Sequence, residues 1–330
     1  MITPAPNLLA FSGGVDSSAL FFKLVEWGVE FDLALVNYKT RPESDAEMEL
    51  ALQLAEKYRK RAYIRIAPLS KKGGKFSESE ARRIRYQFFE ELITRFGYRT
   101  LILAHQLNDR LEWLLMELAK GAGVVEMVAM EEWEEREGYR IWRPFAFTPR
   151  SQIEEYLRSN SLPHFRDRSN EELTYFRNFI RHRFATPFIE RFEAGVARSF
   201  RYLERDKSHL LPPPPRRVGE CYFFDRTDPH RDLRLVDRVV KRLGVVMSEA
   251  QRQEVVNQNF SVVVGGKVAV DTNGRKIFIA PFVKIPLGRW RERCRVLKIP
   301  PKVRGYLVKE GLCGILSTEI FTDVWRSGRS

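Results

Sequence analysis

Short apolar runs alternate with longer segments of helical periodicity through the first half of the chain. The apolar runs predict strands at residues 8–11, 33–36, 62–66 and 100–104. The periodic segments predict helices at residues 17–27, 44–60 and 79–96. This alternation is typical of an α/β fold with a doubly wound parallel sheet and helices on both faces. Ligands of such sheets bind beyond the carboxyl ends of the strands, so we expect the chemistry in the polar segments that follow each strand.

The second half of the chain is less regular. Helices are predicted at residues 108–120, 151–159, 176–192, 233–243 and 248–258, and short strands at 261–264, 267–271 and 276–280. The acidic segment 126–137 is expected to be a surface excursion. Four consecutive prolines at 212–215 predict a stiff extended linker between two domains.

Net charge divides sharply along the chain. Of the 330 residues, 1–200 carry 30 Lys and Arg against 29 Asp and Glu, whereas 201–330 carry 26 against 14. Residues 284–304 hold eight basic residues and one acidic residue. A one-sided field of this kind is typical of a protein that binds a polyanion, and a solvated basic face is the alternative.

Several classes of protein are not expected. No apolar run approaches the ~20 residues of a membrane span, and no amphipathic apolar face accompanies the charge, so no membrane partner is expected. The first residues lack the pattern of a signal peptide. Cys221, Cys294 and Cys313 are far apart and form no CxxC motif, which argues against a disulfide framework or a zinc ribbon and fits the reducing cytoplasm.

The sharpest motif is the segment Ser12-Gly13-Gly14-Val15-Asp16-Ser17-Ser18, which follows the first predicted strand and opens a helix. Backbone N–H groups at a helix N-terminus bind phosphate, and the three serine hydroxyls add donors. Asp16 would repel a phosphate unless a divalent cation intervened, so we expect Mg²⁺ at Asp16. The lysine of the GxxxxGK[ST] loop is missing. An ordinary glycine-rich turn is the alternative.

Two further groups of polar residues follow. Asp109 and Glu112 lie three residues apart on a predicted helix, with His105 just before it, a set that suits a cation, an amine or a second metal. The alternative is helix capping by Asp109 with a solvated Glu112. Arg177 and Arg181 lie one helical turn apart, so both guanidinium groups can face one anionic site, unless they belong to a basic surface helix.

These motifs resemble known families. The SGGxDSS segment resembles the PP-loop of the ATP pyrophosphatases, which split ATP between its α- and β-phosphates and use the AMP half to activate a carbonyl oxygen. Residues 104–113 and 120–123 resemble the AHHxxDQxET and RGxG segments of the lysidine synthase family, with Gln106, Arg110 and Trp113 in place of the usual His, Gln and Thr. Residues 167–170, 177–182, 80–86, 37–41 and 294–308 resemble further family segments, with Tyr38 in place of a histidine.

The resemblance implies ligation of L-lysine to C2 of the wobble cytidine of a CAU-anticodon tRNA(Ile), with ATP and Mg²⁺, through an adenylated cytidine. It implies an N-terminal PP-loop catalytic domain over residues 1–190, a helical connection and linker over 191–215, and a smaller basic α+β tRNA-binding region over 216–330. Which of Asp109 and Glu112 binds lysine, and which removes its proton, stays open, as does the oligomeric state. The alternatives are a thiolase or an amidating synthetase of the same superfamily, or a non-catalytic RNA-binding module. A thiolase would need cysteines for sulfur or a cluster, whereas all three cysteines follow the linker.

The residues implied by these motifs fall into three sets. The catalytic set is Asp16, His105, Asp109, Glu112 and Arg177. The ATP-binding set is Ser12, Gly13, Gly14, Val15, Asp16, Ser17, Ser18, Asn37 and Arg83. The tRNA-binding set is Arg181, Arg289, Arg291, Arg293, Arg295, Lys298, Lys302 and Arg304.

Overall fold

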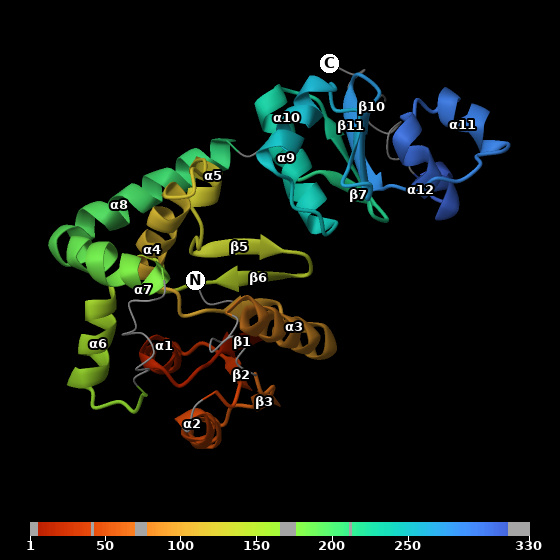
Figure 1. Cartoon of the computed structure of the whole chain (residues 1–330). Helices are drawn as coiled ribbons and strands as arrows, with labels where there is room; N and C mark the ends of the chain where they lie inside the picture. The colour runs from red at the N-terminus through yellow and green to blue at the C-terminus, as the bar shows by residue number, and fades with distance from the viewer. Residues whose placement is uncertain (1–5, 41–42, 70–77, 166–175, 211–212, 316–330) are drawn as a thin grey trace, which may run out of the picture. The chain divides into compact units, whose positions relative to one another are not determined.

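The chain divides into two compact units, residues 1–208 and 209–330 (Figure 1). The structure is a computed structural model and describes residues 6–40, 43–69, 78–165, 176–210 and 213–315. Within these ranges, no helix is long and apolar enough to cross a membrane.

The first unit is built on a six-stranded sheet of order β3-β2-β1-β4-β6-β5. Its strands are β1 (Asn7–Ala10), β2 (Phe31–Asn37), β3 (Ala62–Ile66), β4 (Thr100–Ile102), β5 (Trp133–Arg136) and β6 (Tyr139–Trp142). All neighbours pair in parallel except β5, which runs antiparallel to β6 at the edge. Because β1 lies between β2 and β4, the strand order reverses there, and a ligand site is expected beyond the carboxyl ends of β1 and β4.

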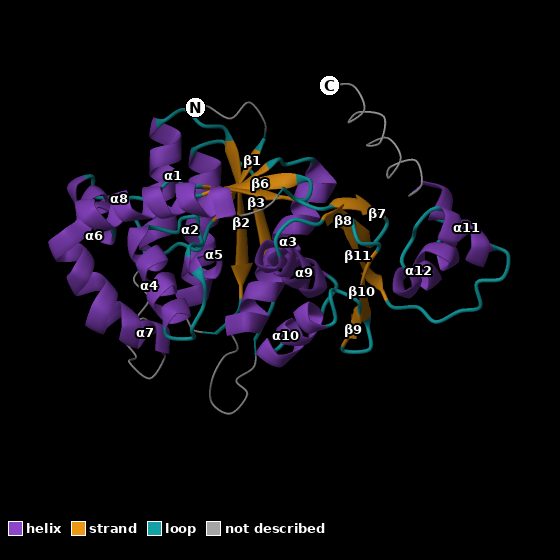
Figure 2. Ribbon diagram, turned by 90° about the horizontal axis from the view of Figure 1, so that it is seen from above, coloured by secondary structure: helices purple, strands orange, loops and turns teal. Residues whose placement is uncertain are grey.

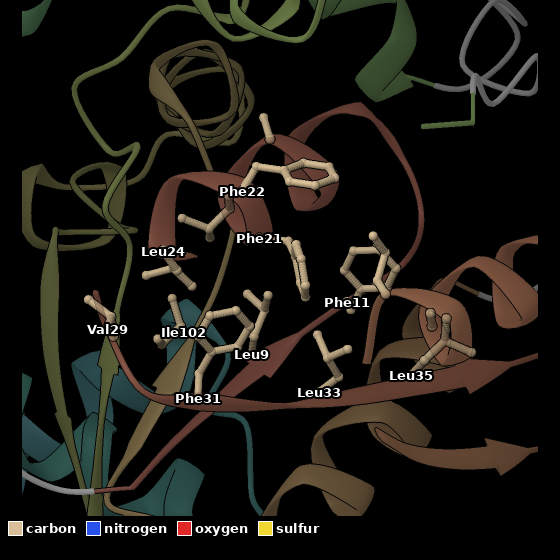
Figure 3. Close-up of a cluster of buried hydrophobic side chains, with 14 of the residues drawn as sticks. Leu9, Phe11, Phe21, Phe22, Leu24, Val29, Phe31, Leu33, Leu35 and Ile102 are labelled. Carbon is tan, nitrogen blue, oxygen red and sulfur yellow. The ribbon is translucent and has the colours of Figure 1, made fainter. Parts of the chain in front are cut away.

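Helices cover both faces of this sheet, which confirms the predicted doubly wound fold. The side chains of Leu8 and Leu9 point to opposite faces because strand residues alternate. Leu9 belongs to a core with Phe21 of α1 (Val15–Glu26), and helices α2 (Glu43–Lys57) and α6 (Arg150–Ser159) pack on the same side (Figure 3). Leu8 belongs to the core formed by α3 (Glu78–Phe96) on the other side.

A helical layer extends the first unit. Helix α4 (Leu107–Leu118) is followed by the short α5 (Val124–Met127), and later by α7 (Phe176–Ile180), a π-helical turn (Arg181–Ala185) and α8 (Thr186–Leu210). The apolar face of α8 packs on Leu107 and Leu111 of α4. Arg110 is fully buried beside this contact, where it binds Glu204 of α8 at 2.6 Å. This packing anchors α8 to the helix that carries Asp109 and Glu112.

The second unit is a five-stranded antiparallel sheet of order β7-β8-β11-β10-β9 (Figure 2). Its strands are β7 (Arg216–Val218), β8 (Cys221–Asp225), β9 (Val262–Val264), β10 (Val268–Thr272) and β11 (Lys276–Pro281). Helices α9 (Pro229–Arg242) and α10 (Glu249–Asn257) pack on one face. Helices α11 (Trp290–Val296) and α12 (Arg304–Lys309), with a 3₁₀ turn (Pro301–Val303), pack on the other. This is the α+β unit expected from the sequence.

The structure differs from the sequence prediction at three places. The acidic segment 126–137 lies largely at the surface, as expected, but it has regular structure, because it includes the end of α5 and the edge strand β5. The predicted boundary at residue 190 falls inside α8, which runs to Leu210 because its apolar face packs on α4 beyond that point. Strands β6, β7 and β8 and helices α11 and α12 were not predicted.

Candidate functional site

The PP-loop segment connects β1 to α1 and is held in place by its own hydroxyls. Ser17 Oγ accepts a hydrogen bond from the backbone N–H of Ser12 at 3.2 Å and donates to Gly14 O at 3.2 Å. Ser18 Oγ donates to Gly13 O at 3.2 Å. Gly13 has φ +74°, and a Cβ there would lie 3.1 Å from a side-chain atom of Glu47, so this position requires glycine. The loop is therefore preformed.

The N-terminus of α1 is open to an anion. Its N-cap is Gly14, which has no side chain to accept from the first-turn N–H groups. A helix of twelve residues follows, so its dipole and these N–H groups point at the space beyond the loop. This arrangement is suited to a phosphate group.

Asp16 lies in the first turn of α1, where it is half-buried and lines the cavity. Its Oδ1 is buried and has no hydrogen-bond partner. Burial raises the pKa of Asp16 to about 7, with a further contribution from the nearby charge of Asp109, while Arg150 and Arg181 oppose the shift. A buried carboxylate oxygen without a donor is a good ligand for a cation.

This environment fits Mg²⁺. Among the described residues, no group of three or more His, Cys, Asp and Glu side chains could hold a metal ion alone. Magnesium, however, keeps several waters and is usually bound through one or two carboxylates together with substrate phosphates. Asp16 beside a phosphate cradle supplies such a carboxylate.

The second group forms one ion-pair cluster between α4 and the α7 region (Figure 1). Glu112 accepts from Arg177 Nε at 2.9 Å and from Arg181 Nε at 2.6 Å, and its side chain is 1% exposed. Asp109 Oδ1 accepts from Arg177 Nη2 at 2.7 Å. The two carboxylates and the two guanidinium groups are thus paired. The two alternatives considered from the sequence, a solvated Glu112 and a basic surface helix, are therefore wrong.

Asp109 has a structural role as well. Gln106 caps α4 and accepts from Asn108 N at 2.6 Å, while Asp109 Oδ2 accepts from Gln106 N at 3.1 Å, which makes a capping box. Burial alone would raise the pKa of Asp109, but Arg177 and the other donors around it hold that pKa below its usual value. Asp109 is therefore an ionised carboxylate near neutral pH.

His105 is held in one tautomer by a residue that sequence reasoning missed. Arg143 Nε donates to His105 Nδ1 at 3.3 Å, while its Nη2 binds Glu134 at 2.7 Å. Nδ1 is thus an acceptor, and the ring proton lies on Nε2. Burial, assisted by Arg143, lowers the pKa of His105 to about 3, against the effect of Asp109. His105 is a neutral hydrogen-bond donor near neutral pH.

This environment predicts a pH dependence of stability. The unfolded chain binds a proton at His105 below pH ~6.5 and the folded chain does not, so acidification favours unfolding. Between pH 6.5 and 5 the free energy of unfolding is expected to fall by about 2 kcal/mol through this group. The variant His105→Asn keeps an acceptor for Arg143 and is expected to lose that part of the slope. Urea unfolding of both proteins at several pH values measures it, and parallel slopes would contradict the assignment.

One cavity of about 580 Å³ brings the two motifs together. It is lined by residues of both motifs and by further side chains, namely Ser12, Gly14, Val15, Asp16, Ser17, Asn37, Tyr38, Arg85, His105, Asp109, Arg150 and Arg181. Its apolar lining includes Leu35, Tyr86 and Phe89, which provide a surface for a flat ring. The cavity lies at the β1–β4 switch point that the topology identifies.

Five predicted residues of the first unit lie outside the cavity lining, among them Gly13 and Ser18, whose mutual hydrogen bond holds the loop. Arg83 is exposed and outside the cavity lining, whereas Arg85 lines it. Arg83 and Arg85 are two positions apart, so their side chains point about 200° apart around the helix axis and only one of them can face the cavity. Glu112 and Arg177 are also outside the lining, since they lie behind Asp109 and Arg181. The predicted segment 167–170 lies outside the described residues.

The sequence analysis did not identify Arg150, because no motif marks this residue. It follows Pro149 at the first turn of α6, and its backbone N–H donates to Asn108 Oδ1 at 3.1 Å. This bond ties α6 to the N-terminus of α4 and holds Arg150 beside the cavity.

The predicted tRNA-binding cations of the second unit have different environments. Arg289, Arg291, Arg293, Arg295 and Lys298 are exposed. Lys302 Nζ donates to Ser261 Oγ at 2.6 Å and Arg304 Nε donates to Ile299 O at 2.8 Å, so these two stabilise the fold of the unit. Helix α9 exposes a further row that sequence reasoning missed, Arg231, Arg238, Lys241 and Arg242, although their helical spacing was readable.

The fold and the loop define a PP-loop nucleotide-binding protein, since the PP-loop domain family matches residues 3–187. Curated tRNA(Ile)-lysidine synthases are similar over nearly the whole chain. The protein of Wolinella succinogenes is 41% identical over 94% of this chain and 95% of its own length. That of Campylobacter jejuni strain RM1221 is 38% identical over 93% and 94%. That of Helicobacter pylori strain J99 is 36% identical over 93% and 90%. The chain belongs to the tRNA(Ile)-lysidine synthase family, and it is an ATP-using ligase.

A solved structure shares the fold. The U34-tRNA thiolase NcsA of Methanococcus maripaludis, with its 4Fe-4S cluster, matches with a TM-score of 0.53 at 17% identity, over 75% of this chain and 84% of that one. At this level of identity the match reflects the common architecture.

Proposed function

We propose that this chain joins L-lysine to C2 of the wobble cytidine in a CAU-anticodon tRNA(Ile). The observation that carries the proposal is the cavity in which the PP-loop and Asp109 face each other, in a chain of this family. A nucleotide on the loop and an amine at Asp109 would meet there. We expect the enzyme in the cytoplasm, where its tRNA substrate is found.

The first step activates the base. The cytidine must leave its stack to reach the cavity. Its C2 oxygen attacks the α-phosphorus of ATP, the bond to pyrophosphate breaks, and an adenylated cytidine results. The N–H groups at the start of α1 and the guanidinium of Arg181 stabilise the developing charge. Mg²⁺ bound at Asp16 would neutralise charge on the phosphates.

The second step joins lysine. The ε-amine attacks C2, the C2–O bond breaks, and AMP leaves with the oxygen. An ε-ammonium has a pKa of ~10.4, so it must lose a proton first. Asp109 lines the cavity as an ionised carboxylate, which suits it to bind and orient the ammonium and to accept the proton that the ammonium releases. Glu112 lies behind it and holds Arg177 and Arg181. His105, neutral and donating from Nε2, is suited to hydrogen-bond a phosphate or the base rather than to remove the proton.

The cysteines favour this reaction over thiolation. Burial raises the pKa of Cys221 and of Cys313 to about 12, so both are thiols near neutral pH. Cys294 is also fully buried, in the same apolar cluster of the second unit. Thiol sulfur in an apolar core is a poor nucleophile and a poor cluster ligand.

The test is incorporation of labelled lysine into an unmodified CAU-anticodon tRNA(Ile) transcript with ATP and Mg²⁺. We expect lysine on the wobble cytidine and one AMP for each lysine joined. A methionine tRNA transcript, which has the same anticodon, is the matched control and should accept none. Pyrophosphate release without lysine incorporation would contradict the proposal and favour another nucleophile. Absence of both would favour an RNA-binding module.

A further inference from the structure

A row of phenylalanines is exposed on α7, the π-helical turn and α8. Phe176, Phe179, Phe184, Phe188 and Phe192 each have between 40% and 50% of their surface exposed. The opposite side of the same segment, with Ala185, Ile189 and Val196, is buried against α4. The buried cluster of this segment is thus formed by the inner face, and about half of each outer ring remains exposed.

The rings form two contacting pairs along the segment. Phe179 and Phe184 are in edge-to-face contact at 5.6 Å, and Phe188 and Phe192 lie 5.0 Å apart. The π-helical turn brings residues five apart into register, which is why Phe179 meets Phe184. We call Phe179, Phe184, Phe188 and Phe192 the aromatic ridge.

The surroundings of the ridge are basic. Residues 176–201 contain six arginines and two glutamates. Arg183 and Arg191 are exposed, and the guanidinium of Arg191 lies 5.6 Å from the centre of the Phe192 ring. Arg177 and Arg181, which bind Asp109 and Glu112, belong to the same helical turns as the start of the ridge. The ridge therefore belongs to the same segment as Arg181, which lines the cavity, although its rings face another side of the helix.

The aromatic and basic side chains of the ridge and its surroundings indicate which class of ligand can bind there. A duplex presents phosphates but few free ring faces, so the phenylalanines would stay exposed to water. An apolar protein face would cover the rings but leave the arginines without counter-charge. Unstacked nucleotides present both, because bases stack on aromatic rings and phosphates pair with arginine.

We propose that the aromatic ridge binds the single-stranded loop of the RNA substrate, with bases stacked on Phe184, Phe188 and Phe192 and phosphates at Arg183 and Arg191. The inference rests on the proposed function for the identity of the RNA. It assigns a surface, on the segment that carries Arg181, to the nucleotides that flank the base entering the cavity.

The experiment measures binding of an RNA hairpin with a CAU loop to the full chain, without ATP or lysine. The double variant Phe188→Ala/Phe192→Ala is expected to weaken the Kd by about tenfold or more, since each stacked base contributes ~1–3 kcal/mol. Phe188→Trp should restore most of the affinity lost in the single variant Phe188→Ala, because tryptophan also stacks. Tyr202→Ala, which removes another exposed aromatic ring further along α8, is the matched control and should bind like the unaltered chain.

Two other outcomes would overturn the proposal. An equal loss for a blunt duplex of the same length would show that the rings do not read unstacked bases. Unchanged RNA binding, with a shift from dimer to monomer in sedimentation, would show that the ridge is a contact between two copies of this chain. Thermal stabilisation of the double variant by Mg²⁺ together with ATP checks that the PP-loop is intact. Lysine incorporation and hairpin binding are measured in separate assays. The proposed function and the proposed role of the aromatic ridge can therefore be rejected separately.

Discussion

Replacing Glu112 with glutamine is expected to abolish both pyrophosphate release and lysine incorporation, with a loss of at least about 100-fold in turnover. Glutamine keeps the volume but offers one carbonyl oxygen where the carboxylate accepts from both Arg177 and Arg181. Its amide group would face a guanidinium as a second donor. Arg181, which lines the cavity, would then lose its position beside the phosphates.

The same substitution is expected to lower stability, because it removes the negative charge and one acceptor oxygen from this ion-pair cluster. The cost is about 2–4 kcal/mol, reduced from a fully buried case because Arg177 is 38% exposed. For a unit of this size that corresponds to a Tm lower by roughly 10 °C. Assays at 25 °C together with circular dichroism separate lost chemistry from lost structure.

Asp109→Asn is the matched variant for Glu112→Gln, because both exchange a carboxylate for an amide on α4. The side-chain carbonyl of the asparagine can still accept from the Gln106 N–H, so the capping box and the fold are expected to persist. Pyrophosphate release should remain, while lysine incorporation should fall and the KM for lysine should rise. If both variants lose pyrophosphate release equally, Asp109 does not act at the lysine step. If both variants incorporate lysine at a near-normal rate, neither carboxylate has the role proposed for it.

The fold of the first unit could be predicted because its signals are local. Leu8 to Phe11 and Ala62 to Ile66 are apolar runs of strand length, and the helices between them have regular apolar spacing. Strand β5 was missed for a physical reason. Trp133, Glu134 and Glu135 belong to an edge strand that pairs on one side only, so its composition is that of a surface.

The motifs of the site could be predicted from the sequence, but the ion pairs between their side chains could not. The residues at the carboxyl ends of β1 and β4 could be found from the strands that precede them. Glu112 is bound by Arg177 and Arg181 only because α7 packs on α4. Arg177 and Glu112 are 65 residues apart along the chain, so no local pattern predicts their contact. Arg143 and Arg150 carry no motif, and only the fold brings them to His105 and the cavity. The charge of the second unit was evident, but the roles of Lys302 and Arg304 in its fold depend on tertiary contacts.

Replacing Asp16 with asparagine is expected to stabilise the ATP-free protein and to abolish its activity. The pKa of Asp16 is raised to about 7, so the folded chain binds a proton that the unfolded chain releases above pH ~3.8. Stability therefore falls as the pH rises from about 4 to 7, and the cost of the charged form is complete above pH 7. Asparagine removes that cost and its repulsion with Asp109, although its buried amide needs partners, so a net gain of about 1–3 kcal/mol is expected at pH 8.

The loss of function follows from the same burial. An isolated carboxylate oxygen in this position is unfavourable unless a cation binds it, so we expect the proposed binding of Mg²⁺ with ATP to recover the stability lost in the ATP-free protein. Thermal unfolding with and without Mg²⁺ and ATP measures this exchange. The unaltered chain should gain several degrees from the pair and little from ATP alone, whereas Asp16→Asn should start higher and gain little from either. A variant that starts lower, or that still responds fully to Mg²⁺ with ATP, would show that Asp16 serves the loop and not the metal.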